Sequence, residues 1–244
     1  MSNIITLYDI PSRLGETAWS PNTLKAKFSL HYKGLPFKTV WVEYPDVATV
    51  CKEIGAEPTQ TEPSPFYTLP VIHDPSTNKT ISDSFAIAEY LDETYPDTPS
   101  LFPKGSLALQ AAFQKVVKET CIAPIFPIVF SYTNSILNSR SQEYFRGTRE
   151  KWFGKTLEEL SPEESAKREE DWEKVRTGWD ILAGWMRKNR EGDFIMGDTL
   201  SFADITVAAA LTAIIRIMGP EFERTEVMKD GTLSRMMKAF GNYD

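Results

Sequence analysis

The sequence predicts a small α/β domain with the element order βαβ-ββα, followed by a larger all-α helical domain. Strand-like runs alternate with helical runs up to a proline-containing segment at residues 97–104. Beyond that segment the strand signal disappears and the apolar residues recur at helical spacing. We therefore expect a first domain over residues 1–96, a linker over 97–104 and a helical domain over 105–244.

The first elements predict a βαβ unit. A β-branched and aromatic run at 4–8 predicts a strand. The helix that follows begins at Ser20, a hydroxyl residue at the N-cap, with Pro21 at the first helical position, and it ends before Gly34. Residues 37–42 predict a second strand, which follows the helix closely enough to run parallel to the first.

A β-hairpin and a helix complete the predicted α/β domain. A loop rich in proline and threonine at 56–64 leads into a strand at 67–72, and turn residues at 74–78 precede a short strand at 80–81. Residues 83–96 predict a helix, because apolar residues recur there at a spacing of four until a proline prevents continuation.

Two helix starts are clear in the second domain. Residues 161–164 form a capping-box pattern that predicts a long charged helix ending at Gly192. Ser201 and Asp204 form a second capping box, which predicts an apolar core helix. The predicted apolar stripe of the first of these helices is Trp172, Val175, Trp179, Leu182 and Met186.

Composition excludes several classes of protein. The 244 residues carry a net charge of −7, which argues against a nucleic-acid surface. The two cysteines, Cys51 and Cys121, lack the spacing of a disulfide framework or a zinc site, and they fit a reducing, cytoplasmic location. Residues 1–10 do not resemble an export signal. The most apolar run, 205–218, is shorter than the roughly 20 residues that cross a bilayer, so we expect no membrane span.

Ser20 is the first candidate for chemistry. A helix N-terminus presents free N–H groups and a partial positive charge, so a thiolate held beside the Ser20 hydroxyl would be stabilised and its pKa lowered. The alternative is that Ser20 only caps the helix, as Ser-Pro pairs commonly do. Tyr8, at the end of the first strand, is the main rival for this role, although its place in an apolar alternation favours packing.

Two further positions are candidates for ligand binding. Pro70 interrupts a strand-like run, which indicates either a cis peptide that exposes the backbone of Leu69 or an edge strand or bulge. Asp83 and Ser84 start a helix, where a carboxylate, a hydroxyl and free N–H groups can hold an amino acid, or where they simply form a cap.

Taken in order, these motifs resemble the glutathione transferase family. In that family a thioredoxin-like domain binds glutathione and a helical domain supplies the acceptor pocket. The runs at 5–9, 27–34, 69–72 and 83–96 resemble most the etherase-related, serine-type branch, which includes fungal FuA-like and bacterial β-aryl etherase-like proteins. The resemblance covers nearly the whole chain.

The resemblance implies a role for each site residue. Ser20 would be catalytic, Pro70 would be cis with the Leu69 backbone pairing to the cysteinyl part of glutathione, and Asp83 and Ser84 would bind the γ-glutamyl end. It also implies glutathione as co-substrate without a metal, hydrophobic aromatic acceptors and a homodimer. Because Ser20 replaces the cysteine of thiol-type relatives, a mixed disulfide at that position is excluded.

The implied activity is attack by a glutathione thiolate in conjugation, peroxide reduction or aryl ether cleavage of aromatic compounds. The alternative is a carrier of aromatic small molecules with little or no catalysis. Lys52 is a weak candidate partner for the glycyl carboxylate, and residues 123–132 could face an apolar acceptor pocket. The aromatic residues of the helical domain from which such a pocket could be built are Phe113, Phe126, Phe130, Tyr132, Tyr144, Trp152 and Phe153.

Overall fold

A four-stranded mixed sheet organises the first part of the chain. The computed structural model describes residues 4–189, 191–219, 222, 227–241 and 243. The sheet has the order β2-β1-β3-β4, in which β1 pairs parallel with β2 and β3 pairs antiparallel with β1 and β4. The predicted βαβ-ββα order is confirmed. The strands are β1 (Ile5–Asp9), β2 (Phe37–Trp41), β3 (Val71–Asp74) and β4 (Lys79–Ser82).

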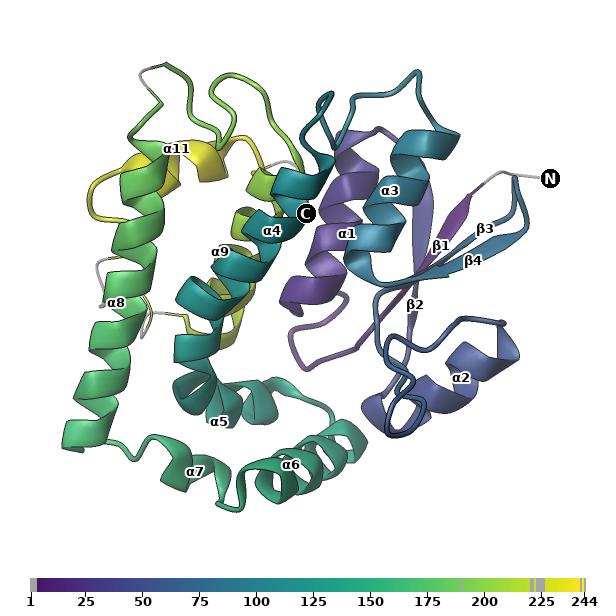
Figure 1. Ribbon diagram of the computed structural model, residues 1–244. Helices are drawn as coiled ribbons and strands as arrows, with labels where there is room; N and C mark the ends of the chain where they lie inside the picture. Colours follow the sequence, from purple (N-terminus) through teal and green to yellow (C-terminus); the bar gives the residue numbers. More distant parts are fainter. Residues whose placement is uncertain (1–3, 190, 220–221, 223–226, 242, 244) are drawn as a thin grey trace.

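Two helices separate this sheet from the helical domain. Figure 1 shows α1 (Pro21–Tyr32) and α3 (Ser84–Thr94) standing between the strands and the helices of the second part of the chain. Pro21 occupies the start of α1 as predicted, and Gly34 follows its end with φ +65°. A short helix that we did not predict, α2 (Val47–Glu53), follows β2 after a 3-10 turn at Tyr44–Asp46.

The second part of the described chain is helical, as predicted. Helix α1 packs against α9, so one hydrophobic core extends across residues 97–104. The domain boundary predicted there stays a prediction. The helices are α4 (Leu107–Val117), α5 (Phe126–Ile136), α6 (Ser139–Phe153), α7 (Leu157–Leu160), α8 (Ala166–Met186), α9 (Phe202–Met218) and α11 (Thr232–Lys238).

The predicted start of the long helix was wrong by four residues. Ser165 caps α8 by accepting from the backbone N–H of Arg168, and Glu164 has φ +56°, which a helical residue does not adopt. Ser161 instead follows α7, and its carbonyl accepts from the Arg168 guanidinium. The helix ends at Met186 rather than at Gly192. Its predicted apolar stripe is buried throughout.

The second predicted capping box is confirmed at the start of α9. The Asp204 carboxylate accepts from the backbone N–H and hydroxyl of Ser201, at 2.9 and 3.0 Å, and from the backbone N–H of Ile195 at 2.7 Å. Asp204 and Ser201 are fully buried. This box fixes the start of the helix that packs against α1.

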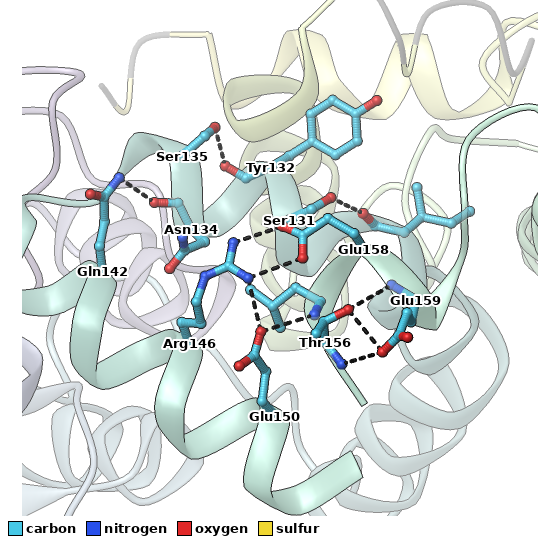
Figure 2. A network of polar contacts seen from close by, with 12 residues as sticks. Ser131, Tyr132, Asn134, Ser135, Gln142, Arg146, Glu150, Thr156, Glu158 and Glu159 are labelled. Carbon is cyan, nitrogen blue, oxygen red and sulfur yellow. Dashed lines mark hydrogen bonds and ion pairs between the residues drawn. The ribbon is translucent and has the colours of Figure 1, made fainter. Parts of the chain in front are cut away.

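A polar network fastens α6 to its neighbours. Arg146 donates to Glu150 on its own helix and to Glu158 on α7, at 2.8 and 2.7 Å (Figure 2). Thr156 and Glu159 form the capping box of α7, and Gln142 donates to the carbonyl of Asn134 on α5. These contacts fasten α6 to α5 and to α7.

One helical run has the length and composition of a membrane-crossing helix. The most apolar window within Leu107–Ile136 has a mean hydropathy of 1.2, and 33% of that window is buried. Core helices of soluble proteins pass the same test. Here a π turn at Lys118–Ile122 and a 3-10 turn at Ala123–Ile125 interrupt the run, which packs against α8 and α9. Our expectation of no membrane span stays a prediction.

Candidate active site

Ser20 lies at the N-terminus of α1 but does not cap it. Its backbone is extended, with φ −75° and ψ 129°, and its hydroxyl makes no capping hydrogen bond. The Ser20 carbonyl accepts from the Leu24 N–H at 2.9 Å and from the Thr23 hydroxyl at 3.2 Å. The helix start is therefore stabilised by backbone and neighbouring groups, and the alternative that the Ser20 hydroxyl serves as a cap is not supported.

Hydrogen bonds fix the two residues before Ser20, Ala18 and Trp19. The Trp19 indole donates to the Ile10 carbonyl at 2.9 Å, and Arg216 on α9 donates to the Ala18 carbonyl. Asp9, at the end of β1, is fully buried, and its desolvation raises its pKa to about 6 although its carboxylate accepts from the Ile10 N–H at 2.7 Å. These contacts fix where the Ser20 side chain can lie.

Ser20 borders a cavity of about 280 Å³, which we call the apolar cavity. Its walls come from the start of α1, from α5, from α6 and from α9. The side chains that the following argument uses are Ser20, Tyr44, Phe126, Phe130, Arg149 and Trp152. Most of its lining is aromatic or aliphatic, as in pockets that bind small apolar ligands.

A second cavity of about 220 Å³, the polar cavity, lies beside the first. Asp83, Lys25, Lys118 and Gln114 border it. Pro21 and Asn22 border both cavities, together with Ile122 and Phe126. The first turn of α1 therefore separates a mainly apolar space from a charged one.

The polar cavity contains charged groups and one unsatisfied amide oxygen among the described residues. Burial lowers the pKa of Lys25 to about 8, while the nearby Asp83 carboxylate opposes that shift and the Lys118 ammonium adds to it. Gln114 Oε1 is buried and has no hydrogen-bond partner among the described residues. Asp83 caps α3 by accepting from the N–H groups of Phe85 and Ala86, at 2.8 and 3.2 Å.

The remaining predicted site residues lie in the α/β domain. The Leu69–Pro70 peptide is cis, which confirms the expected geometry, and both residues are buried immediately before β3. Ser84 is the first residue of α3 and is 3% exposed. Leu69, Pro70 and Ser84 border neither of the two cavities. The structure therefore brings Ser20 and Asp83 to adjacent spaces and leaves these three outside them.

Comparison with known proteins matches both parts of the chain to one family. Residues 19–94 match the family model of the glutathione S-transferase N-terminal domain, and residues 108–243 match that of the C-terminal domain. The chain belongs to the glutathione S-transferase family. Members of this family use glutathione as their co-substrate.

Several solved structures resemble the chain over its whole length. A glutathione S-transferase of Ceriporiopsis subvermispora, solved with glutathione, is 47% identical with a TM-score of 0.95, over 99% of this chain and 98% of that one. A FuA-type glutathione transferase of Phanerochaete chrysosporium is 40% identical with a TM-score of 0.91, over 99% and 97%. The fungal FuA-like resemblance is confirmed.

A relative from Aspergillus flavus supports the same family assignment. The glutathione S-transferase-like protein ustS of Aspergillus flavus is 34% identical over 218 residues, which cover 84% of this chain and 78% of that protein.

The rival residues have other surroundings. Tyr8 packs beside the core cluster that contains Trp19 and Cys51, and burial raises its pKa. Lys52 lies on α2 with its ammonium 5.5 Å from the centre of the Tyr67 ring and borders neither cavity. Burial also raises the pKa of Cys51, and that of Cys121 to about 12, which disfavours thiolate formation. No cluster of metal-ligating side chains occurs within the described part of the chain.

Sequence reasoning located part of the apolar cavity and missed the rest. Ile125, Phe126, Val129 and Phe130 border it, as expected for the run at 123–132, and so does Trp152. Phe113 and Tyr132 pack on the core instead, Tyr144 stacks on Tyr44, and Phe153 packs beside Phe130. Tyr44, Phe145 and Arg149 are among the lining side chains that the sequence did not indicate.

Proposed function

We propose that this chain is a glutathione transferase that activates the glutathione thiol through Ser20 and directs it at aromatic acceptors in the apolar cavity. The observation that carries the proposal is that the Ser20 hydroxyl, at the N-terminus of α1, borders this cavity without capping the helix. A hydroxyl donor and free helix N–H groups both favour a thiolate over a thiol. Holding thiolate and acceptor together adds a proximity contribution.

The polar cavity supports a place for the γ-glutamyl end of glutathione. An α-amino acid carries one ammonium and one carboxylate. Asp83 and the free Gln114 oxygen match the ammonium, while Lys25 and Lys118 match the carboxylate. Because the first turn of α1 borders both cavities, a peptide with its γ-glutamyl end here would place its thiol near Ser20. Ser84 and the Leu69 backbone beside cis Pro70 complete the proposed glutathione site.

A titration of glutathione bound to the protein tests the proposal. Thiolate absorbance is followed against pH for the wild type, Ser20→Ala and Ser29→Ala. Ser29 is the matched control, because it is a buried serine of the same helix whose hydroxyl binds the Lys25 carbonyl. We expect a bound-thiol pKa below the ordinary value of about 8.5 in the wild type and the control, and a higher one in Ser20→Ala.

The conjugation rate with 1-chloro-2,4-dinitrobenzene is the second readout. Removing one donor to a reacting anion costs about 100-fold in rate, so Ser20→Ala should fall by that factor while Ser29→Ala keeps its activity. Binding of glutathione with an unshifted thiol pKa would favour the carrier of aromatic ligands over the enzyme. Product analysis with a hydroperoxide and with an aryl ether then separates conjugation, peroxide reduction and ether cleavage, which all begin with attack by the same thiolate.

We also propose that the protein is a cytoplasmic homodimer. Leu107, Leu109 and Val116 leave α4 with exposed apolar surface, and Leu109 is 72% exposed. Such surface on a helix supports a contact with a second copy. Sedimentation equilibrium should give a dimer for the wild type and a monomer for Leu109→Glu. A monomeric wild type at all concentrations would contradict this part of the proposal.

A further inference from the structure

Arg149 is a cation in the wall of the apolar cavity. It lies on α6, and its guanidinium carbon is 4.2 Å from the centre of the Phe145 ring, 4.7 Å from that of Trp152 and 5.4 Å from that of Tyr44. Cations are attracted to the faces of aromatic rings. Three rings therefore fix the guanidinium in place.

Among the described residues, no carboxylate pairs with Arg149. The one hydrogen bond of its guanidinium to a described residue runs from Nη1 to the hydroxyl of Thr148, at 2.8 Å. The adjacent Glu150 is occupied, because it accepts from Arg146 and from the Leu157 N–H, at 2.8 and 3.3 Å. Figure 2 shows Glu150 within this network, joined to Arg146. The Glu150 carboxylate therefore links α6 to the start of α7 and does not pair with Arg149.

Acids on the element facing α6 are committed as well. Glu43 accepts from Asn138 and Ser141, and Asp46 forms an ion pair with Arg140 at 2.9 Å. Tyr44 supplies no negative charge near neutral pH, because burial raises its pKa to about 12. The described residues around Arg149 therefore leave its charge without a counter-ion.

An unpaired guanidinium in a partly buried site is costly. Burial lowers the pKa of Arg149, but an arginine stays protonated at any physiological pH. Ring faces compensate for part of the lost hydration. A guanidinium stacked on rings keeps its N–H donors at its edge, where they match the two oxygens of a carboxylate.

We infer that Arg149 selects acceptor substrates in which an aromatic ring carries a carboxylate. The ring would lie against Phe126 and Phe130, with its carboxylate on Arg149 and its electrophilic carbon toward Ser20, since all of these side chains border one cavity. The inference rests on the proposed function for the acceptor reaction, but the selective binding of aromatic carboxylates is tested without turnover.

Equilibrium binding tests the role of Arg149 directly. The probes are 3,5-dinitrobenzoate and 3,5-dinitrobenzamide, which match in shape, lack a leaving group and differ in charge. Isothermal titration compares the wild type, Arg149→Gln, Arg149→Lys and Lys151→Gln. Lys151 is the matched control, since it is an exposed cation on the same helix that borders neither cavity.

The wild type and Lys151→Gln should bind the benzoate more tightly than the benzamide. Losing a charge-assisted hydrogen bond costs about 10- to 100-fold, so Arg149→Gln should weaken benzoate binding by that factor and benzamide binding by less than about threefold. Arg149→Lys should retain part of the preference. Equal losses for both probes, or a wild type without preference, would overturn the inference; the second outcome needs no variant to fold.

Kinetics then link the selectivity to the reaction. With 4-chloro-3,5-dinitrobenzoate, the glutathione sulfur forms a bond to the ring carbon, the C–Cl bond breaks, chloride leaves with the bonding electrons and the thiol proton passes to solvent. The matched amide undergoes the same reaction, and rates are divided by those without enzyme. Arg149→Gln should raise KM for the benzoate and leave kcat and the amide nearly unchanged. A selective fall in kcat for the benzoate would instead contradict a binding role.

The two proposals fail differently. If the wild type binds 3,5-dinitrobenzoate selectively but conjugates neither 4-chloro-3,5-dinitrobenzoate, nor its amide, nor 1-chloro-2,4-dinitrobenzene, the transferase proposal fails and the Arg149 carboxylate site stands. If all three are conjugated with no preference for the benzoate, the transferase stands and the site fails.

Discussion

The two cavities beside α1 share a wall and differ in almost everything else. The apolar cavity is lined by aromatic and aliphatic side chains with one cation, Arg149, whereas the polar cavity holds two ammonium groups, a carboxylate and an unsatisfied amide oxygen. Pro21 and Asn22 border both. A hydrophilic ligand and a hydrophobic ligand could thus bind in adjacent cavities, which are separated by the first turn of α1.

The difference shows how two unlike substrates can be served independently. Charged groups gain selectivity through directed hydrogen bonds, while an apolar wall gains affinity through buried area and discriminates less. Helix α9 contributes to both cavities, with Thr206 in the polar one and Ala210, Ala213, Ile214 and Ile217 in the apolar one. Substitutions in one cavity should therefore leave the other intact, and a substitution that loosens α9 should affect both.

The largest expected effect comes from Asp204→Ala, which acts on the shared helix. Two buried donors, the N–H and the hydroxyl of Ser201, and the half-buried Ile195 N–H lose their acceptor. We expect the free energy of unfolding to fall by about 3 kcal/mol, measured by urea unfolding. Glu159→Ala, in the exposed capping box of α7, is the control and should cost about 0.5 kcal/mol. Equal losses in the two variants would refute the special role of the α9 start.

Lys25→Gln should separate the cavities. It removes an ammonium of the polar cavity, so binding of S-methylglutathione should weaken about 30-fold while binding of 3,5-dinitrobenzamide stays the same. Lys38→Gln removes the same charge from the exposed face of β2 and serves as the control. Isothermal titration measures both ligands. A parallel loss of both would show that the cavities are not independent.

The pH dependence of the same binding sharpens this comparison. Because burial lowers the pKa of Lys25 to about 8, its ammonium is charged below that pH and loses its proton above it. Affinity for S-methylglutathione should be constant up to neutrality and fall as pH rises through about 8. Titrations at several pH values with Lys25→Gln as baseline remove the ionisation of the ligand itself. A wild-type profile parallel to that baseline would exclude Lys25 from the site.

The smallest effect is expected at the rim of the apolar cavity. Trp152 is 57% exposed, and it contributes a ring to the cavity and to the stack on Arg149. Trp152→Ala should weaken 3,5-dinitrobenzoate binding about threefold and leave S-methylglutathione unaffected. The neighbouring Phe153 is 48% exposed and borders neither cavity, so Phe153→Ala is the matched control. Identical changes in both variants would remove Trp152 from the site.

The α/β domain could be predicted closely because its signals are local. Pro21 and Gly34 mark the ends of α1, and the pattern beginning at Asp83 marks α3, since proline, glycine and capping residues act on the backbone at their own positions. Ser20, Pro70 and Asp83 could be predicted as candidate site residues for the same reason. The strand before the hairpin was less well placed, because residues 67–70 have strand composition but β3 begins at Val71.

The helical domain was harder because packing decides it. Helix α6 carries six charged residues, and the arc of its circumference without charge holds Ser141, Tyr144, Phe145, Thr148 and Trp152. The face that meets the α/β domain can therefore be recognised only once the bounds of the helix are known. Arg149 was missed, although Phe145 four residues before it and Trp152 three residues after it have the spacing of one helical face. Residues 161–164 have the composition of a capping box, but the hydroxyl that caps α8 is that of Ser165.

The Ser20 hydroxyl makes no capping hydrogen bond, so its chemistry can be changed without changing the fold. Since that hydroxyl contributes no bond to the start of α1, exchanging oxygen for sulfur at this one atom should cost the fold little. Ser20→Cys would install a thiol that forms and resolves mixed disulfides. Replacing this one atom would therefore convert the proposed activation of a bound thiol into exchange with that thiol, while the framework stays unaltered.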